Sequence, residues 1–93
     1  MRYEYDPHKS QANKIKHGID FEEAQALWLD DFAIEQNARS DTESRLMIIG
    51  RIDDKVWSAF ITYRDQAVRI ISVRCARPQE IADYEKELAR RRT

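Results

Sequence analysis

The stretch DPHKSQANKIKHGIDFEEA, residues 6–24, contains the signals for two helices and for the corner between them. Its first residue, an aspartate, is a typical N-cap, and Pro7 follows at the first helical position, where a missing N–H costs no hydrogen bond. Gly18 favours the left-handed conformation that ends a helix, and Asp20 repeats the N-cap signal. The stretch therefore predicts a helix over residues 7–17, a sharp turn and a second helix.

Outside this stretch, polar and apolar residues alternate in segments that are typical of β-strands. The predicted strands cover residues 2–5, 32–36, 45–52, 55–63 and 67–74, and the predicted helices cover residues 7–17, 20–29 and 78–92. Connections of two or three residues join the last three strands, which forces neighbours to pair antiparallel. The expected fold class is α+β in the order β-α-α-β-β-β-β-α, with an antiparallel meander, two N-terminal helices and one C-terminal helix.

Composition predicts one small soluble domain, with 42% hydrophobic and 35% charged residues among 93. No apolar run is long enough to span a bilayer, and no signal segment is recognisable, so we expect a cytoplasmic protein without membrane contact. Cys75 is the single cysteine, which excludes an internal disulfide. With only two histidines beside it, a zinc site is not expected.

The net charge of −1 hides a segregation of charge along the chain. Residues 1–18 carry four basic and two acidic side chains, residues 19–54 carry three and ten, and residues 55–79 carry five and one. The first helix and the later strands could therefore form one cationic surface for a phosphate-bearing ligand. The alternative, that these charges only solvate the protein, stays open.

Cationic side chains gather on the first predicted helix. Lys9, Asn13 and Lys16 have the spacing of one helical face, which suits a phosphate backbone but is also typical of a solvated surface. His17 lies at the helix C-terminus, where the helix dipole favours its protonated form. It is a candidate general acid or base, and capping of the helix carbonyls is the alternative.

Arginines recur near the ends of the last two predicted strands. Arg64 and Arg74 are candidates for binding phosphate through their planar guanidinium groups, and an ion pair across the sheet is the alternative for both. For Arg69 we expect the ion pair. Strict alternation along the last strand predicts that Ile70, Ser72 and Arg74 share one face.

Two more groups have an ordinary and a functional interpretation. Glu43 and Arg45 lie two residues apart at the start of a strand and point the same way, so a local ion pair is the expected role. Tyr84 on the last helix could contribute a phenol to a site, although core packing is the expected role.

Taken in chain order, these motifs resemble the BrnT family, the toxin half of a bacterial type II toxin–antitoxin pair. The matching residues are Tyr5-Asp6-Pro7, Lys9, Asn13, 16–19, 21–24, Glu43, Arg45, Ile49-Gly50, Thr62, Arg64, 69–76, Glu80 and Tyr84-Glu85. The set spans nearly the whole chain and is more specific than any one motif. One departure is Arg77, where the family usually has Ser or Thr. It removes an N-cap and a capping box with Glu80, and it leaves the start of the last helix open.

This resemblance implies a RelE-like fold and a ribonuclease that blocks translation, without a metal or another cofactor. The implied partners are an RNA substrate and a BrnA-like antitoxin, with which the toxin forms a heterotetramer. Operator DNA is contacted only indirectly, through the antitoxin. The alternative is a non-catalytic binding module of the same fold that acts through protein–protein contacts, because fold alone does not fix function.

In the implied reaction the RNA supplies its own 2′-hydroxyl as nucleophile, so the protein contributes proton transfer and positive charge. The predicted catalytic residues are His17, Arg64, Arg74 and Tyr84, with Glu22 as a weaker candidate for proton transfer. The predicted RNA-binding residues are Lys9, Lys16, Arg45 and Arg77. Such a site requires Arg64 and Arg74 of the sheet to face the cationic side chains of the first helix.

Overall fold

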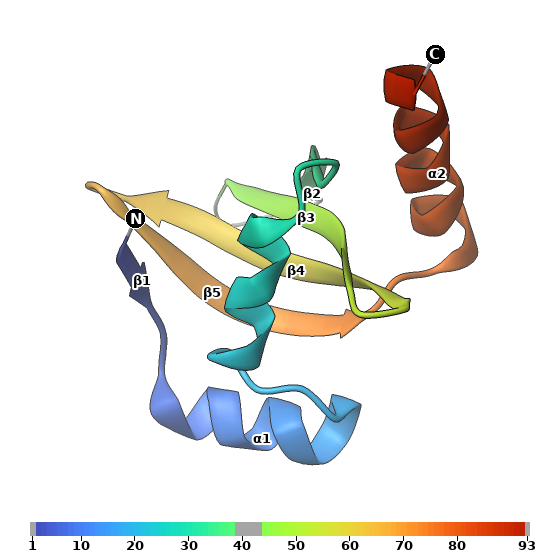
Figure 1. Cartoon of the computed structure of the whole chain (residues 1–93). Helices are drawn as coiled ribbons and strands as arrows, with labels where there is room; N and C mark the ends of the chain where they lie inside the picture. Colours follow the sequence, from blue (N-terminus) through green and yellow to red (C-terminus); the bar gives the residue numbers. More distant parts are fainter. Residues whose placement is uncertain (1, 39–43, 93) are drawn as a thin grey trace.

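The chain folds around one five-stranded sheet, shown in Figure 1 for a computed structural model that describes residues 2–38 and 44–92. Its elements are β1 (Arg2–Glu4), α1 (Pro7–His17), the 3-10 helix η1 (Glu23–Leu29), β2 (Ile34–Ala38), β3 (Arg45–Ile52), β4 (Lys55–Arg64), β5 (Ala67–Cys75) and α2 (Pro78–Arg92). The predicted order of strands and helices and the α+β class are confirmed.

The strands lie in the spatial order β1-β5-β4-β3-β2. From β2 to β5 each strand pairs antiparallel with the next one in the chain, as predicted. β1, however, runs parallel to β5, with Arg2 opposite Ala67 and Glu4 opposite Arg69. The prediction of a wholly antiparallel sheet is therefore wrong, and the sheet is mixed. The long connection after β1, which contains α1, is what permits the parallel pairing.

The corner between α1 and η1 is built by the predicted capping residues. Asp6 Oδ1 accepts a backbone N–H of the first turn at 2.8 Å. Gly18 ends α1 with a φ of 83° and donates its N–H to Lys14 O at 2.9 Å. Asp20 and Glu23 form a reciprocal capping box, with N–H to carboxylate distances of 2.7 and 3.0 Å. The corner is thus fixed by local hydrogen bonds.

Two elements differ from the prediction by more than one residue at a boundary. The second helix is a 3-10 helix of seven residues and not an α-helix over residues 20–29. The second strand begins two residues later than predicted, at Ile34, because the Asp30 side chain holds a turn by accepting the Phe32 N–H at 2.9 Å. Of the predicted loop 37–43, the first two residues belong to β2, and residues 39–43 lie outside the described part of the chain.

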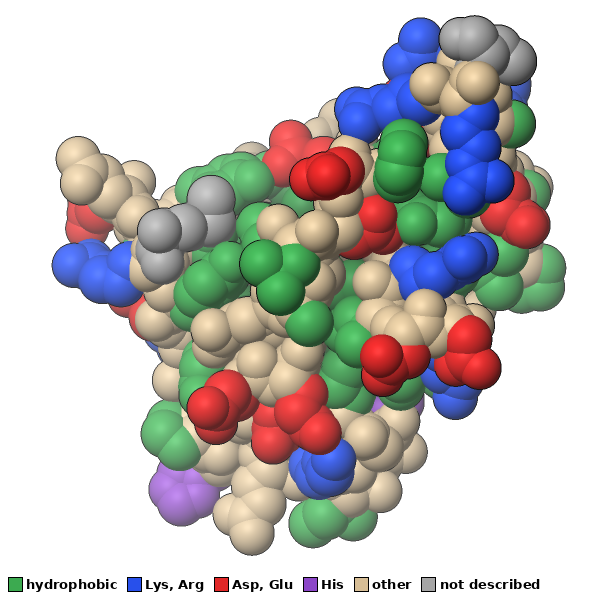
Figure 2. All heavy atoms as spheres, in the orientation of Figure 1, with side chains coloured by type: hydrophobic (Ala, Val, Ile, Leu, Met, Phe, Trp, Pro, Cys, Tyr) green, Lys and Arg blue, Asp and Glu red, His purple; other side chains and the backbone are tan. Residues whose placement is uncertain are grey.

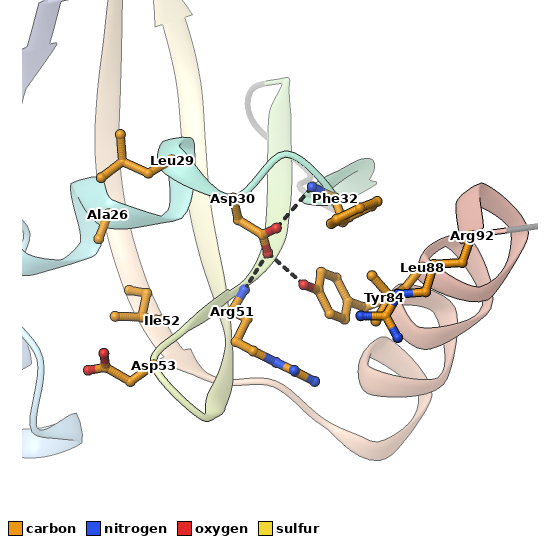
Figure 3. Close-up of a pocket in the computed structure, with 10 residues that line it drawn as sticks. All are labelled: Ala26, Leu29, Asp30, Phe32, Arg51, Ile52, Asp53, Tyr84, Leu88 and Arg92. Atoms are coloured by element: carbon orange, nitrogen blue, oxygen red, sulfur yellow. Dashed lines mark hydrogen bonds between the residues drawn. The ribbon is translucent and has the colours of Figure 1, made fainter.

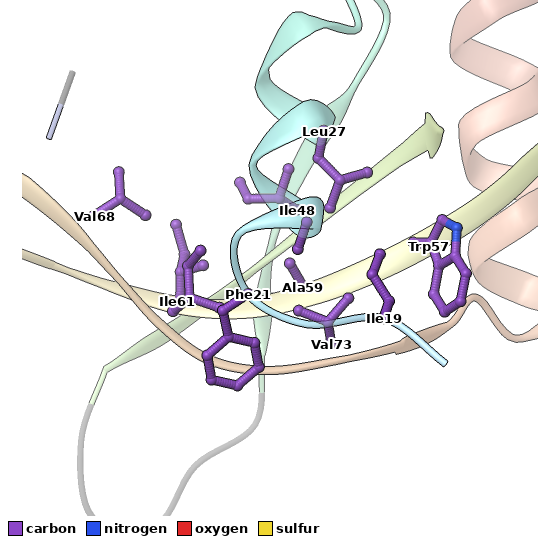
Figure 4. Packing of buried hydrophobic residues seen from close by; sticks show 11 residues of the cluster. Ile19, Phe21, Leu27, Ile48, Trp57, Ala59, Ile61, Val68 and Val73 are labelled. Carbon is purple, nitrogen blue, oxygen red and sulfur yellow. The ribbon is translucent and has the colours of Figure 1, made fainter. Parts of the chain in front are cut away.

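The sheet buries apolar side chains on both faces. On one face, η1 and the segment before it cover a cluster drawn in Figure 4, in which Phe21, Leu27 and Ile61 are almost fully buried. On the other face, α2 packs Tyr84 and Leu88 against the second cluster. Figure 1 shows α2 standing at one end of the sheet. The second face is therefore helix-covered at one end only.

Candidate functional site

A row of polar side chains crosses the second face of the sheet at the end away from α2. Glu4 on β1 lies opposite Arg69 on β5, which lies opposite Thr62 on β4. Residues paired across a sheet point to the same side, so these three side chains share a face. Arg64, two residues beyond Thr62, points the same way. The parallel pairing of β1 thus adds a carboxylate to a row of cationic side chains.

These side chains surround a polar hollow of about 340 Å³. It is lined by Lys9, Arg45, Thr62, Arg64, Arg69 and Ile71. Three of the predicted residues, Lys9, Arg45 and Arg64, are therefore brought together, from α1, β3 and β4. Four cationic groups around one hollow would attract an anion.

A break in the alternation of β5 shapes one wall of this hollow. Ile70 and Val73 are both buried in the cluster under η1, although strict alternation would place them on opposite faces. The register between β4 and β5 shifts at this point, which leaves Ile71 on the open face beside Arg69. The prediction that Ile70 shares a face with Ser72 and Arg74 is therefore wrong.

Glu4 makes the ion pair that was expected for Arg69. Its Oε1 lies 3.7 Å from Arg69 Nη1 and 3.9 Å from Arg64 Nε, and about a third of its side chain is exposed. Both distances are longer than a hydrogen bond. Arg69 and Arg64 thus share one carboxylate and still line the hollow.

Arg74 lies elsewhere and has a different environment. It pairs with Ser58, four residues before Thr62 on β4, so about 14 Å of strand separates it from the hollow. Its guanidinium donates two hydrogen bonds to Glu80 at 2.8 and 2.9 Å and lies over the Phe60 ring at 5.0 Å. Arg64 lines the hollow with Lys9 of α1 but Arg74 does not, so the two arginines do not both face the cationic side chains of α1 as the predicted site required.

The Glu80 carboxylate also organises the start of α2. It accepts hydrogen bonds from Ser58 Oγ at 2.8 Å and from the Arg77 N–H at 2.9 Å. The second of these is half of a capping box, so α2 begins at Pro78 although residue 77 is an arginine. The hydrogen bonds from Arg74, with smaller contributions from the Arg77 N–H and Ser58, hold the pKa of Glu80 at about 2. The Arg77 side chain is exposed.

The C-terminal end of α1 does not reach the hollow. Lys16 and His17 lie seven and eight residues after Lys9, which amounts to about 11 and 12 Å along a helix. Between them, Asn13 is buried and faces the sheet: its side chain bonds Val73 O at 2.9 Å, Val73 N–H at 3.1 Å and Ile19 O at 2.8 Å. The proposed surface stripe of Lys9, Asn13 and Lys16 is therefore wrong. Asn13 is instead buried and hydrogen-bonds the backbone of β5 at Val73, past the point where the pairing with β1 ends.

Tyr84 is buried beneath α2, in the region shown in Figure 3. Its hydroxyl donates to Asp30 Oδ2 at 2.6 Å, and the same oxygen accepts the Arg51 N–H at 2.8 Å. Burial, together with the bond to Asp30, raises the pKa of Tyr84 to about 12. Core packing, the role expected for Tyr84, is confirmed.

The side of the molecule that bears η1 is shown in Figure 2. Figure 2 shows acidic side chains scattered over the face that bears η1, and lysine and arginine side chains around the end of α2. Glu22 is exposed on this side, at the start of η1, and Glu43 lies outside the described residues. The sequence predicted that cationic side chains of the first helix and of the later strands could share one surface, and Lys9 does lie with the arginines of β3, β4 and β5 around the hollow.

The described residues contain neither a cluster of metal ligands nor a membrane-spanning helix. Within residues 2–38 and 44–92, no group of three or more His, Cys, Asp or Glu side chains is arranged to hold a metal ion. No helix in the same part of the chain has the length and apolarity to cross a membrane.

Sequence reasoning did not select two residues beside the hollow. Arg69 was assigned only to an ion pair, and Glu4 was only part of a strand. The partner of β1 is a long-range feature of the fold that alternation within β1 does not indicate. The place of Thr62 beside the hollow, by contrast, could have been predicted from the sequence, because Thr62 and Arg64 are two residues apart on one strand and so point to the same face.

Comparison with known protein families shows which family the chain belongs to. The family model described as ribonuclease toxin, BrnT, of type II toxin–antitoxin system matches residues 5–80, a range that contains every residue lining the hollow. Among curated proteins no sequence matches the chain. Because the match covers most of the 93 residues, the chain belongs to the BrnT family of ribonuclease toxins of type II toxin–antitoxin systems.

Proposed function

We propose that this protein is an endoribonuclease that cleaves RNA at the cationic hollow, without a metal ion, and so inhibits translation. The observation that carries the proposal is the convergence of Lys9, Arg45, Arg64 and Arg69 on one open hollow. Family membership supports the ribonuclease activity, and the cations supply what a phosphodiester requires.

The proposed reaction is attack of the RNA 2′-hydroxyl on the adjacent phosphorus. The pentacoordinate phosphorane carries one more negative charge than the substrate, so cations fixed around it lower the barrier. Arg64 and Arg69 are suited to this task because a guanidinium can bind two phosphate oxygens at once. Lys9 and Arg45 hold the flanking phosphates.

The remaining predicted residues fit this site less well. Lys16 and Arg77 are exposed and are proposed to contact RNA beyond the hollow. The catalytic roles predicted for His17, Arg74 and Tyr84 stay predictions, and none of their contacts supports these roles. Arg74 and Tyr84 are each engaged by a carboxylate, and His17 is about 12 Å along α1 from Lys9.

Membership in a type II family implies a protein antitoxin as partner. We propose that this antitoxin is BrnA-like, that it neutralises the toxin in a cytoplasmic heterotetramer, and that it alone contacts operator DNA. The RelE-like fold implied by the resemblance belongs to the same proposal.

The proposal is tested by incubating the purified protein with single-stranded RNA in EDTA. The expected products carry a 2′,3′-cyclic phosphate and a 5′-hydroxyl, both identified by mass spectrometry. Arg64→Ala should abolish their formation, whereas Lys86→Ala, an exposed cation on α2, should not. RNA that is bound but stays intact at high protein excess would favour the binding-only alternative, and cleavage that requires added metal would refute the metal-independent reaction.

A further inference from the structure

Cleavage by the 2′-hydroxyl needs a group that accepts its proton, and none of the described residues that line the hollow offers one. The part of its lining that the structure describes consists of one lysine, three arginines, a threonine and an isoleucine. Lysine and arginine are cationic at neutral pH, and a threonine hydroxyl is not a base. Within residues 2–38 and 44–92, the acceptor must therefore come from the border of the hollow.

Glu4 is the carboxylate that the fold brings to this border. Parallel pairing of β1 with β5 sets Glu4 opposite Arg69, and its Oε1 lies within 4 Å of both Arg69 and Arg64. Two arginines that bind one phosphate would hold the neighbouring ribose beside the carboxylate they share. About a third of the Glu4 side chain is exposed, so a ribose can reach it.

The Arg74–Glu80 pair is an example of a glutamate–arginine pair with a structural role in this protein. Glu80 receives four hydrogen bonds of 2.8 to 2.9 Å, two of them from Arg74, and its side chain is 12% exposed. Glu4, in contrast, receives no side-chain hydrogen bond from any described residue, and its arginines stand at 3.7 and 3.9 Å. The Glu4 oxygens therefore remain available to a donor from outside.

We propose that Glu4 is the general base of the reaction, an inference that rests on the proposed function. Its carboxylate takes the proton of the 2′-hydroxyl while the 2′-oxygen forms a bond to phosphorus. The bond between phosphorus and the 5′-oxygen then breaks, and that oxygen takes a proton from water. Glu4 returns its proton to the hydroxide so formed, which closes the cycle without any other reactant.

The test compares wild type with Glu4→Gln, which keeps the shape of the side chain and removes its basicity. Single-turnover cleavage of RNA in EDTA should slow by about 100-fold or more, the usual contribution of a general base. Affinity for the same RNA with a 2′-deoxy cleavage position should change by less than about tenfold, because the cations are retained. Glu85→Gln, an exposed carboxylate on α2, serves as the matched control.

Two further readouts define the role of Glu4: the first separates proton transfer from mere placement of the arginines, and the second separates a base from a proton donor to the leaving group. The wild-type rate should fall at acidic pH as the base is protonated, and Glu4→Gln should lose this fall, whereas Glu4→Asp should keep it. An RNA with sulfur as the bridging 5′ leaving atom needs no protonation of that atom, so the defect of Glu4→Gln should persist with it. Thermal unfolding verifies that each variant is folded.

Each outcome bears on one of the two proposals. Equal cleavage by Glu4→Gln and wild type, with cyclic phosphate ends from both, overturns the role of Glu4 and leaves the proposed function standing. A slow Glu4→Gln with an unchanged acid limb, or with full rescue by the sulfur substrate, also overturns it. Intact RNA with wild type overturns the proposed function, and the role of Glu4 with it.

Discussion

Replacing Glu80 by glutamine tests the interpretation that the Arg74–Glu80 pair supports the fold. The carboxylate joins β4, β5 and the first turn of α2 through Ser58, Arg74 and the Arg77 N–H. Glutamine keeps the size of the side chain but loses the charge that both arginine hydrogen bonds use. The variant should therefore be less stable, while the residues that line the hollow are unchanged.

The magnitude follows from the pKa of Glu80. A value of about 2, against 4.5 for an unperturbed glutamate, corresponds to about 3 kcal/mol of stabilisation of the folded state at neutral pH. Because the folded-state pKa is lowered, this stability is present above pH 4.5 and is lost as the pH falls toward 2. We expect urea unfolding at pH 7 to give a free energy of unfolding lower by up to about 3 kcal/mol for Glu80→Gln. The two proteins should converge as the pH falls.

Glu87→Gln is the control for this experiment. The pKa of Glu87 is also held at about 2, by hydrogen bonds from Arg90 and Arg91, but this pair lies at the solvent-exposed end of α2. Water screens such pairs, so the loss should be clearly smaller. A loss for Glu80→Gln that equals the control, or one that does not depend on pH, would refute the structural role of the Arg74–Glu80 pair.

Three other substitutions should change the free energy of unfolding in stated directions. Asn13→Ala strips the Val73 N–H and two carbonyls of their buried partner and should cost about 3 kcal/mol, and a loss near zero in urea titrations would contradict its role at the edge of β5. Tyr84→Phe should cost about 2 kcal/mol. Because the pKa of Tyr84 is raised to about 12, the stability that its hydroxyl gives to the wild type is lost as the pH rises from 10 toward 12. Tyr84→Phe should therefore lose less stability than the wild type over this pH range, and equal losses in the two proteins would contradict the role of the Tyr84 hydroxyl. Gly18→Ala should cost roughly 1 kcal/mol in thermal unfolding through its φ of 83°, since a Cβ there meets no atom within 4 Å, and an unchanged melting temperature would contradict the strain.

Local features of the fold were predictable from the sequence because their causes are local. Asp6, Gly18 and Asp20 act on backbone groups within a few residues, so their identities fix the ends of α1 and the corner after it. The strands β3, β4 and β5 follow from alternation and short turns, and Asp53 and Asp65 adopt left-handed φ values of 57° and 56° in these turns.

Features that depend on distant partners were not predictable in this way. Ile70 and Ile71 are equally apolar, so nothing in their identity reveals that the register shift turns one inward and the other outward. Asn13 is polar and was placed on the surface, but its amide can replace a missing strand at Val73. These partners are set by the tertiary fold and not by the residues themselves.

The candidate site was predictable in part for the same reason. Lys9, Arg45 and Arg64 were selected by charge and motif, and the fold brings them together. Arg69 and Arg74 are both arginines on one strand, and Arg74 was chosen because alternation placed it on one face with Ser72. What separates them is Glu80, which binds Arg74 closely, and Glu4, which lies farther from Arg69.

The most direct test that RNA is cleaved at the hollow is single-turnover cleavage of RNA in EDTA by Arg69→Ala and Arg74→Ala, measured side by side on folded protein. Arg69→Ala should slow cleavage by about 100-fold or more, the effect of removing one transition-state donor, with little loss of stability. Arg74→Ala should lower the free energy of unfolding and slow cleavage by less than about tenfold, since Arg74 binds Glu80 and lies outside the hollow. The reverse result, with Arg74→Ala inactive and Arg69→Ala active, would contradict the placement of the site.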